Sequence, residues 1–140
     1  MSFDKVLKML SWFKKTPPTP YAKLGGAKGL QQLVNEFYQV MDADPRAKEC
    51  RELHQKDLSE ANEKLFAFLS GWLGGPPLFA QKYGHPRLRM RHFPFAIGER
   101  ERDQWLYCME QALEHCRVAP ELRTELLRAL GELAERVRNQ

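Results

Sequence analysis

From Tyr21 to the end of the chain, apolar residues recur at the three- and four-residue spacing of α-helices. The clearest stripe runs from Leu30 to Met41, and similar stripes occupy residues 105–116 and 122–137. No segment alternates apolar and polar residues over the length of a β-strand. A chain of 140 residues has room for one hydrophobic core of ordinary size. We therefore expect a single all-α domain.

Local signals predict where several helices begin and end. Residues 57–60, Asp-Leu-Ser-Glu, have the pattern of a capping box, in which Asp57 accepts the amide three residues on and Glu60 reaches back. Residues 74–77, Gly-Gly-Pro-Pro, end the helix that follows this box. Pro120 suits the first turn of the last helix. Between these helices, prolines and glycines surround one short basic helix, expected at residues 86–92.

Residues 1–20 are interpreted as an arm and a stiff proline-rich spacer, and residues 21–140 as the domain. In the arm, five apolar residues share one face of a short helix: Phe3, Val6, Leu7, Leu10 and Phe13. Such a basic amphipathic helix can rest on a membrane surface or a partner. The alternative, which we favour, is an arm that is disordered or packs on its own domain.

Charge and cysteine content limit the classes of function. No apolar run approaches the roughly 20 residues that cross a bilayer, and charges within the first fourteen residues exclude a secretory signal. We therefore expect no integral membrane contact. The three cysteines, Cys50, Cys108 and Cys116, lack the spacing of a metal or redox motif. We therefore expect all three to be free thiols in a protein of the reducing cytoplasm.

The basic residues concentrate in two segments. Residues 1–28 contain six lysines and one aspartate, and residues 81–98 contain four basic residues and no acidic one. Arginines and lysines in such a segment can bind nucleic-acid phosphates. A basic helical module that binds nucleic acid without a cofactor is therefore kept as the alternative function, although we expect no nucleic-acid partner.

His92 ends the short basic helix and lies beside the apolar sequence Phe-Pro-Phe-Ala-Ile at residues 93–97. Because Pro94 has no amide hydrogen, backbone carbonyls near His92 lack partners, and one of them can accept the ring Nδ1–H. That bond would leave Nε2 free as a metal ligand. One histidine is too few donors for zinc but is enough for haem. From composition alone, a structural histidine with satisfied hydrogen bonds is the favoured interpretation.

Several segments occur in a fixed order: Gly-Gly-Ala-Lys at 25–28, Phe-Tyr at 37–38, Gly-Gly-Pro at 74–76, His-Pro-Arg-Leu-Arg-Met-Arg-His at 85–92, and Glu-Arg-Asp-Gln-Trp-Leu at 101–106. Together they closely resemble the group II truncated haemoglobins, over about residues 21–139. The resemblance implies a two-over-two helical sandwich around haem b, with His92 as the proximal iron ligand. Tyr38 and Trp105 match the family's distal hydrogen-bond donors, and His54 is assigned to a third distal position.

The resemblance also implies which other residues surround the haem. Arg91 is the first choice to pair with a haem propionate, and Arg87 or Arg89 could serve instead. Ala61 falls where many globins have a distal histidine, and Leu65 lies one turn further on. The remaining expected haem neighbours are Phe37, Leu58, Phe68, Tyr83, Leu88, Phe95, Ile97 and Met109.

The implied function is binding of dioxygen, nitric oxide or another diatomic ligand, stabilised by Tyr38, Trp105 and His54. Several donors would slow dioxygen release, so redox chemistry is favoured over oxygen delivery, with nitric oxide dioxygenase or peroxidase-like activity among the options. Such chemistry needs an unidentified reductase, and a homodimer is left open. Tyr38 and Trp105 could alternatively be core residues, with a backbone carbonyl accepting from Tyr38. A further hypothesis is that Tyr38 or His54 binds the ferric iron as an internal sixth ligand.

Overall fold

The computed structural model describes residues 2–8 and 17–140, and all regular secondary structure in these residues is helical. The all-α prediction is therefore confirmed. After the helical residues 3–8, the elements are α2 (Pro20–Lys23), α3 (Gly26–Ala43), the short 3-10 helix η1 (Pro45–Ala47), α4 (Lys48–Glu52), α5 (Ser59–Trp72), α6 (Leu78–Tyr83), α7 (Leu88–His92), α8 (Glu99–His115) and α9 (Pro120–Val137).

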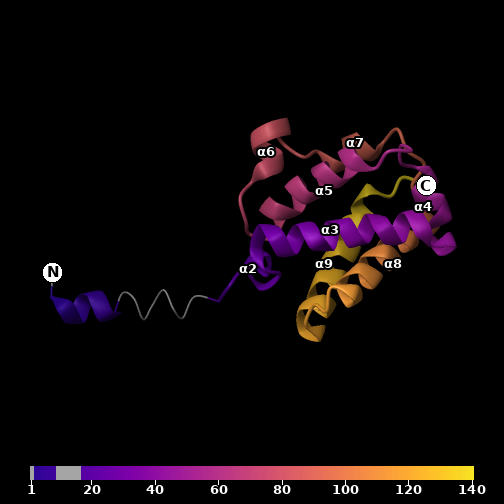
Figure 1. Ribbon diagram of the computed structural model, residues 1–140. Helices are drawn as coiled ribbons and strands as arrows, with labels where there is room; N and C mark the ends of the chain where they lie inside the picture. Colours follow the sequence, from indigo (N-terminus) through magenta and orange to yellow (C-terminus); the bar gives the residue numbers. More distant parts are fainter. Residues whose placement is uncertain (1, 9–16) are drawn as a thin grey trace.

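Two pairs of helices form the body of the domain. Helix α3 packs against α5 on one side and crosses α8 on the other, and α8 pairs with α9 (Figure 1). This is the predicted two-over-two layout. The core between the pairs consists of the apolar stripes of α3, α8 and α9, whose fully buried members include Leu30, Val34, Phe37, Met109 and Leu113. Each such side chain contributes roughly 1.5–3 kcal/mol of transfer free energy.

Glycines make the turn into α3 and the end of α5 sterically feasible. Gly25, before α3, has φ of 99°, a left-handed conformation that favours glycine. A Cβ atom on Gly75 would lie 2.6 Å from the ring of Tyr21, whose amide donates to the carbonyl oxygen of Leu73. The start of the domain is thereby packed against the turn that follows α5.

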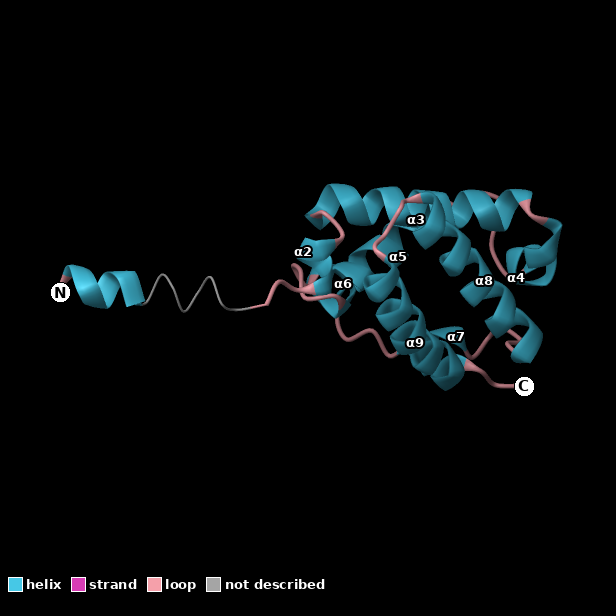
Figure 2. Ribbon diagram, turned by 90° about the horizontal axis from the view of Figure 1, so that it is seen from below, coloured by secondary structure: helices cyan, strands magenta, loops and turns pink. Residues whose placement is uncertain are grey.

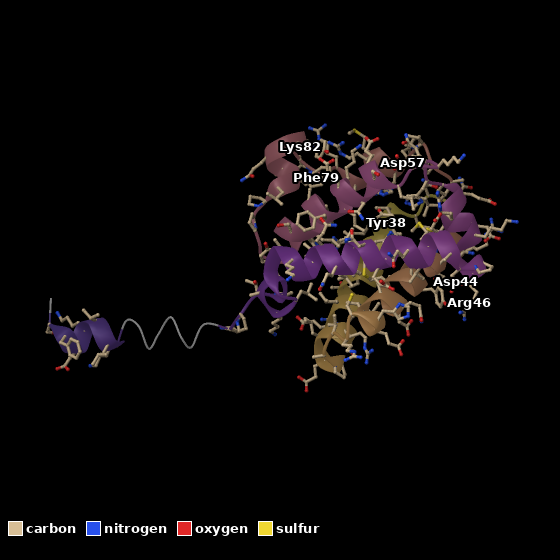
Figure 3. The ribbon with its side chains drawn as sticks, viewed as in Figure 1. Tyr38, Asp44, Arg46, Asp57, Phe79 and Lys82 are labelled. Atoms are coloured by element: carbon tan, nitrogen blue, oxygen red, sulfur yellow. The ribbon has the colours of Figure 1, made fainter. Side chains whose placement is uncertain are left out.

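Asp44 fixes the C-terminal end of α3. Its carboxylate accepts hydrogen bonds from the Arg46 amide at 2.9 Å and from the Tyr107 hydroxyl at 2.6 Å. Arg46 Nε approaches the same carboxylate at 3.2 Å, and Figure 3 labels both Asp44 and Arg46. These bonds lower the pKa of Asp44 to about 2. The cluster joins the turn after α3 to the middle of α8.

Two predicted helix starts are wrong in detail. Helix α5 begins at Ser59, and Asp57 accepts the Ser59 amide two residues on, at 2.8 Å, because its short side chain forms a local turn. Glu60 does not complete the capping box but pairs with Lys64 at 2.8 Å. Helix α7 begins at Leu88 rather than residue 86, because Arg87 has φ of 43°, which breaks the helical path.

The arm is described in part. Within its helical residues 3–8, the side chain of Phe3 is 76% exposed and that of Leu7 is 48% exposed. Leu10 and Phe13, which complete the predicted apolar face, lie outside the described residues. None of the described helices is both long enough and apolar enough to cross a bilayer.

Candidate functional site

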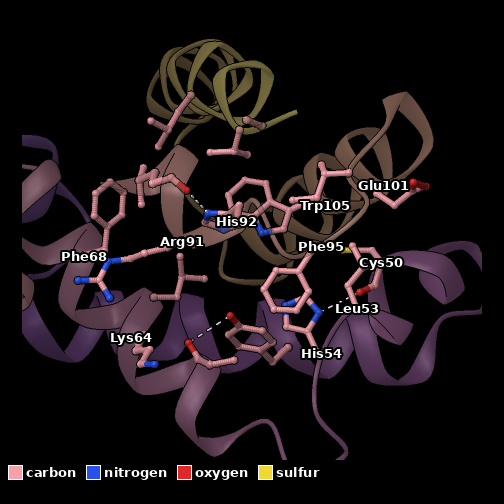
Figure 4. A pocket seen from close by; sticks show the side chains of 18 of the residues that line it. Cys50, Leu53, His54, Lys64, Phe68, Arg91, His92, Phe95, Glu101 and Trp105 are labelled. Atoms are coloured by element: carbon pink, nitrogen blue, oxygen red, sulfur yellow. Dashed lines mark hydrogen bonds between the residues drawn. The ribbon is translucent and has the colours of Figure 1, made fainter. Parts of the chain in front are cut away.

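A cavity of about 600 Å³ opens between the two helix pairs, and α7 forms part of its wall (Figure 4). Its volume is in the range of small-molecule and cofactor sites. Eleven of the residues expected around the haem line this cavity: Tyr38, His54, Ala61, Leu65, Phe68, Leu88, Arg91, His92, Phe95, Ile97 and Trp105. They come from α3, α5, α7 and α8 and from the loops after α4 and α7.

His92 has the tautomer that a metal ligand requires. Its Nδ1 lies 2.6 Å from the carbonyl oxygen of Leu88, one turn earlier in α7. A carbonyl oxygen only accepts, so a hydrogen is on Nδ1, and in the neutral ring Nε2 then carries the lone pair. The predicted hydrogen bond to a nearby backbone carbonyl is confirmed, with Leu88 as the partner.

Tyr38 projects from α3 into the interior, and its hydroxyl donates to the carbonyl oxygen of Ala61 at 3.2 Å. This is longer than the usual 2.7–2.8 Å of such a bond. Burial raises the pKa of Tyr38, so the hydroxyl keeps its proton at neutral pH. Tyr38 is therefore a hydrogen-bond donor on the cavity wall. Its acceptor in this structure is a backbone carbonyl, which is also what we would expect if Tyr38 were only a core residue.

Trp105 enters the cavity from α8, in the same close-up as His92 (Figure 4). In the part of the chain that the structure describes, its indole N–H forms no hydrogen bond. The indole nitrogen is not among the buried polar atoms, so it is accessible from the cavity. Phe37 lies behind both donors, with ring centroids 4.9 Å from Tyr38 and 5.1 Å from Trp105. The aromatic packing of Phe37 thus orients both donors.

His54 differs from the donor role that was predicted for it. Its Nδ1 lies 2.9 Å from the carbonyl oxygen of Cys50, so the ring hydrogen is on Nδ1. Burial lowers the pKa of His54 below its ordinary value, which keeps the ring neutral at pH 7. The Nε2 atom therefore offers a lone pair, and neutral His54 accepts rather than donates hydrogen bonds there.

Charged side chains of both signs lie on the cavity wall, and Figure 4 labels Arg91, Lys64 and Glu101 among them. The cations are Lys64, Arg91 and Arg102, and the carboxylates are Asp57, Glu60 and Glu101. Arg91 Nε donates to the carbonyl oxygen of Pro86 at 2.6 Å, and the Arg91 guanidinium lies 5.1 Å from the ring centroid of Phe79. Lys64, from α5, pairs with Glu60. The predicted Arg91 and the unpredicted Lys64 thus place positive charge on a wall that is largely apolar but also carries carboxylates.

Four expected haem neighbours do not line the cavity. Phe37 and Met109 are fully buried in the core, because the stripes of α3 and α8 turn them toward each other's helices. Leu58 packs against the same core before α5, and the Tyr83 ring packs on Phe79 with centroids 4.8 Å apart.

Sequence reasoning also missed part of the wall. Helix α9 contributes a row of apolar residues to the cavity: Leu130, Leu133, Ala134 and Val137. Their helical spacing is visible in the sequence, but it indicates only a buried face and not what that face covers.

Comparison with known proteins identifies the family. The model of the bacterial-like globins matches residues 19–139. A curated group 2 truncated haemoglobin of Bacillus subtilis is 39% identical over 121 residues, covering 86% of this chain and 89% of the relative. The chain belongs to the group II truncated haemoglobins.

Solved truncated haemoglobins have the same fold. A cold-adapted truncated haemoglobin of the Antarctic bacterium Pseudoalteromonas haloplanktis matches with a TM-score of 0.85 and 46% identity, covering 88% of this chain and 99% of that one. A truncated oxygen-avid haemoglobin from Bacillus subtilis matches with a TM-score of 0.79 and 38% identity, covering 87% and 100%. Both likenesses extend over nearly the whole relative.

The globin family implies a haem cofactor, and the residues of this truncated haemoglobin fit that group. His92 could hold the iron through Nε2, the lining is largely apolar, and Arg91 and Lys64 could pair with the two propionates. No three His, Cys, Asp or Glu side chains gather into another metal site among residues 2–8 and 17–140. The lining of the cavity therefore fits the haem that the family implies.

Proposed function

We propose that this truncated haemoglobin binds dioxygen, nitric oxide or another small diatomic ligand, with His92 holding the haem and Tyr38 and Trp105 stabilising the ligand. The proposal is based on one observation: His92 Nε2 and the Trp105 N–H share a cavity, and that N–H has no acceptor among the described residues. Haem supplies the iron to which the gas binds. The side chains on the cavity wall determine which of these gases is bound most tightly.

Each donor has a distinct role in this proposal. The Trp105 N–H makes no hydrogen bond to residues 2–8 or 17–140 that a ligand would have to break, whereas the Tyr38 hydroxyl must share or leave the Ala61 carbonyl. That exchange costs little, because the 3.2 Å bond is weak and its acceptor is neutral. A ligand that develops negative charge attracts both donors more strongly than a neutral one, so the site favours dioxygen.

Two donors slow ligand release, since a hydrogen bond to a charged acceptor contributes about 1.5–3 kcal/mol. Slow release suits redox chemistry with nitric oxide or peroxide better than oxygen delivery, and the matched structure from Bacillus subtilis is described as oxygen-avid. We propose haem b as the cofactor and an external reductase as the source of electrons. Nucleic-acid binding is not proposed, because Arg91 lies on the cavity wall and donates to backbone carbonyls.

Haem titration of the purified chain tests the proposal. The wild type should give a Soret band at one haem per chain, and His92→Gly should lose the band and regain it when imidazole is added. The matched control is His115→Gly, since His115 pairs with Glu36 on the surface. A folded wild-type chain that takes up no haem would overturn the proposal.

Stopped-flow mixing of the ferrous oxygen complex with nitric oxide separates a binding protein from an enzyme. Rapid loss of the complex followed by repeated turnovers with an added reductant would establish a catalytic cycle. A single turnover, with no re-reduction by any of the reductants tried, would leave a ligand-binding protein.

A further inference from the structure

The helix that carries His92 is weakly anchored by its own packing. Helix α7 has five residues, and none of them is buried. A helix of this length does not persist without outside contacts. Phe93, which follows it, is 78% exposed, so the apolar side chain next to His92 anchors nothing. The position of His92 must therefore be fixed by contacts that other segments make.

The side chain of Asn139 provides such contacts from the C-terminal segment, two residues after α9 ends. Its Oδ1 accepts the Ile97 amide at 2.9 Å, and its Nδ2 donates to the carbonyl oxygen of Phe95 at 2.8 Å. The same Nδ2 lies 3.4 Å from the carbonyl oxygen of His92 itself. Figure 2 shows the end of α9 beside α7, the arrangement that allows these bonds.

Backbone hydrogen bonds extend the same connection. The amides of Asn139 and Gln140 both donate to the carbonyl oxygen of Ile97, at 2.9 and 3.1 Å. Within the loop, the Phe95 amide donates to the carbonyl oxygen of His92 at 3.0 Å. Phe95 and Ile97 line the cavity, so the loop that Asn139 holds is also part of the cavity wall.

We propose that Asn139 is a positioning residue for the haem ligand, which clamps residues 93–97 and so fixes His92 relative to the iron. The inference rests on the proposed function, because it takes His92 to be the ligand. A carboxamide is suited to this task because it donates and accepts at once. An aspartate at this position keeps the acceptor for Ile97 but loses both donated bonds.

Amide hydrogen exchange tests the clamp on the full chain. In Asn139→Ala, exchange at the Ile97 amide should be about tenfold faster, since its acceptor is lost. In Asn139→Asp, the Ile97 amide should stay protected. Gln140→Ala is the matched control, because Gln140 contributes only its backbone amide to the clamp.

Spectroscopy of the ferrous, haem-loaded chain tests positioning. Both Asn139 variants should shift or broaden the iron–histidine stretching band and should release haem to apomyoglobin about tenfold faster than the wild type and Gln140→Ala. Unchanged band and haem release, with faster Ile97 exchange in Asn139→Ala, would overturn the proposal and leave Asn139 as a tether of the chain end. A wild type without haem would overturn the proposed function as well, so the two failures are distinguishable.

Discussion

The Tyr38 hydroxyl donates to the carbonyl oxygen of Ala61 across 3.2 Å, so Tyr38 has an acceptor within the protein. Exchange of this acceptor for a bound ligand predicts a measurable change in ligand kinetics. Tyr38→Phe should raise the dioxygen dissociation rate about tenfold or more, since a bond to a partly charged acceptor is lost. Flash photolysis or stopped-flow displacement by carbon monoxide measures this rate. Tyr107→Phe is the control, because its hydroxyl donates to Asp44 instead.

Trp105→Phe should also raise the dioxygen dissociation rate, by a factor that equals or exceeds that of Tyr38→Phe. The indole N–H has no competing acceptor among the described residues, so its full bond strength is available to the ligand. Trp72→Phe, a change outside the cavity wall, should leave the rate unaltered. If Trp105→Phe behaved like Trp72→Phe, Trp105 would be a packing residue only.

His54→Leu should leave dioxygen dissociation at pH 7.5 within about twofold of the wild type, since the neutral Nε2 has no hydrogen to donate. Burial lowers the pKa of His54 from the ordinary 6.5, so the ring gains its second proton only in more acid solution. The wild-type rate should then fall as the pH decreases below 6.5, and His54→Leu should lack this component. A large effect of His54→Leu at pH 7.5 would restore the donor role.

Phe37→Leu should change both the stability of the fold and the rate of dioxygen dissociation. The substitution removes a fully buried ring and should lower the free energy of unfolding by about 1–2 kcal/mol, as measured by urea denaturation. Because the ring contacts both Tyr38 and Trp105, the dioxygen dissociation rate should rise severalfold as well. Leu126→Ala, a buried change on α9, should lower stability without that kinetic effect.

Asp44→Asn should reduce the acid sensitivity of the fold. The hydrogen bonds from Tyr107 and Arg46 lower the pKa of Asp44 to about 2, below the ordinary 3.8 of an unfolded chain. This stabilisation is complete above about pH 4 and is lost as the pH falls toward 2. Thermal unfolding between pH 5 and pH 2 should therefore show a smaller loss in Asp44→Asn. An identical pH profile would contradict the assigned role.

The long helices could be predicted from the sequence because their cores follow local periodicity. The start of α7 could not, because the left-handed conformation of Arg87 is imposed by its surroundings and is rare for arginine. The role of Asp57 could not be predicted either. A capping box and a two-residue turn use the same residue types, and Asp57 forms the turn.

For the site, the run from His85 to His92 indicated a family and hence a haem ligand. The sequence could not show that His54 bonds to Cys50 through Nδ1, which decides whether it donates or accepts. Nor could it show the bond between Asn139 and Ile97, because these residues are 42 positions apart. Tautomers and long-range amide contacts depend on tertiary geometry and leave no periodic pattern.

The lining of the cavity extends from Tyr38 to Val137, so its walls come from both ends of the domain. During synthesis, a chain that has emerged from the ribosome only as far as α8 lacks the row of residues from Leu130 to Val137 and cannot enclose the cavity. If the cavity takes up haem as proposed, capture of the cofactor would follow synthesis of residues 130–137.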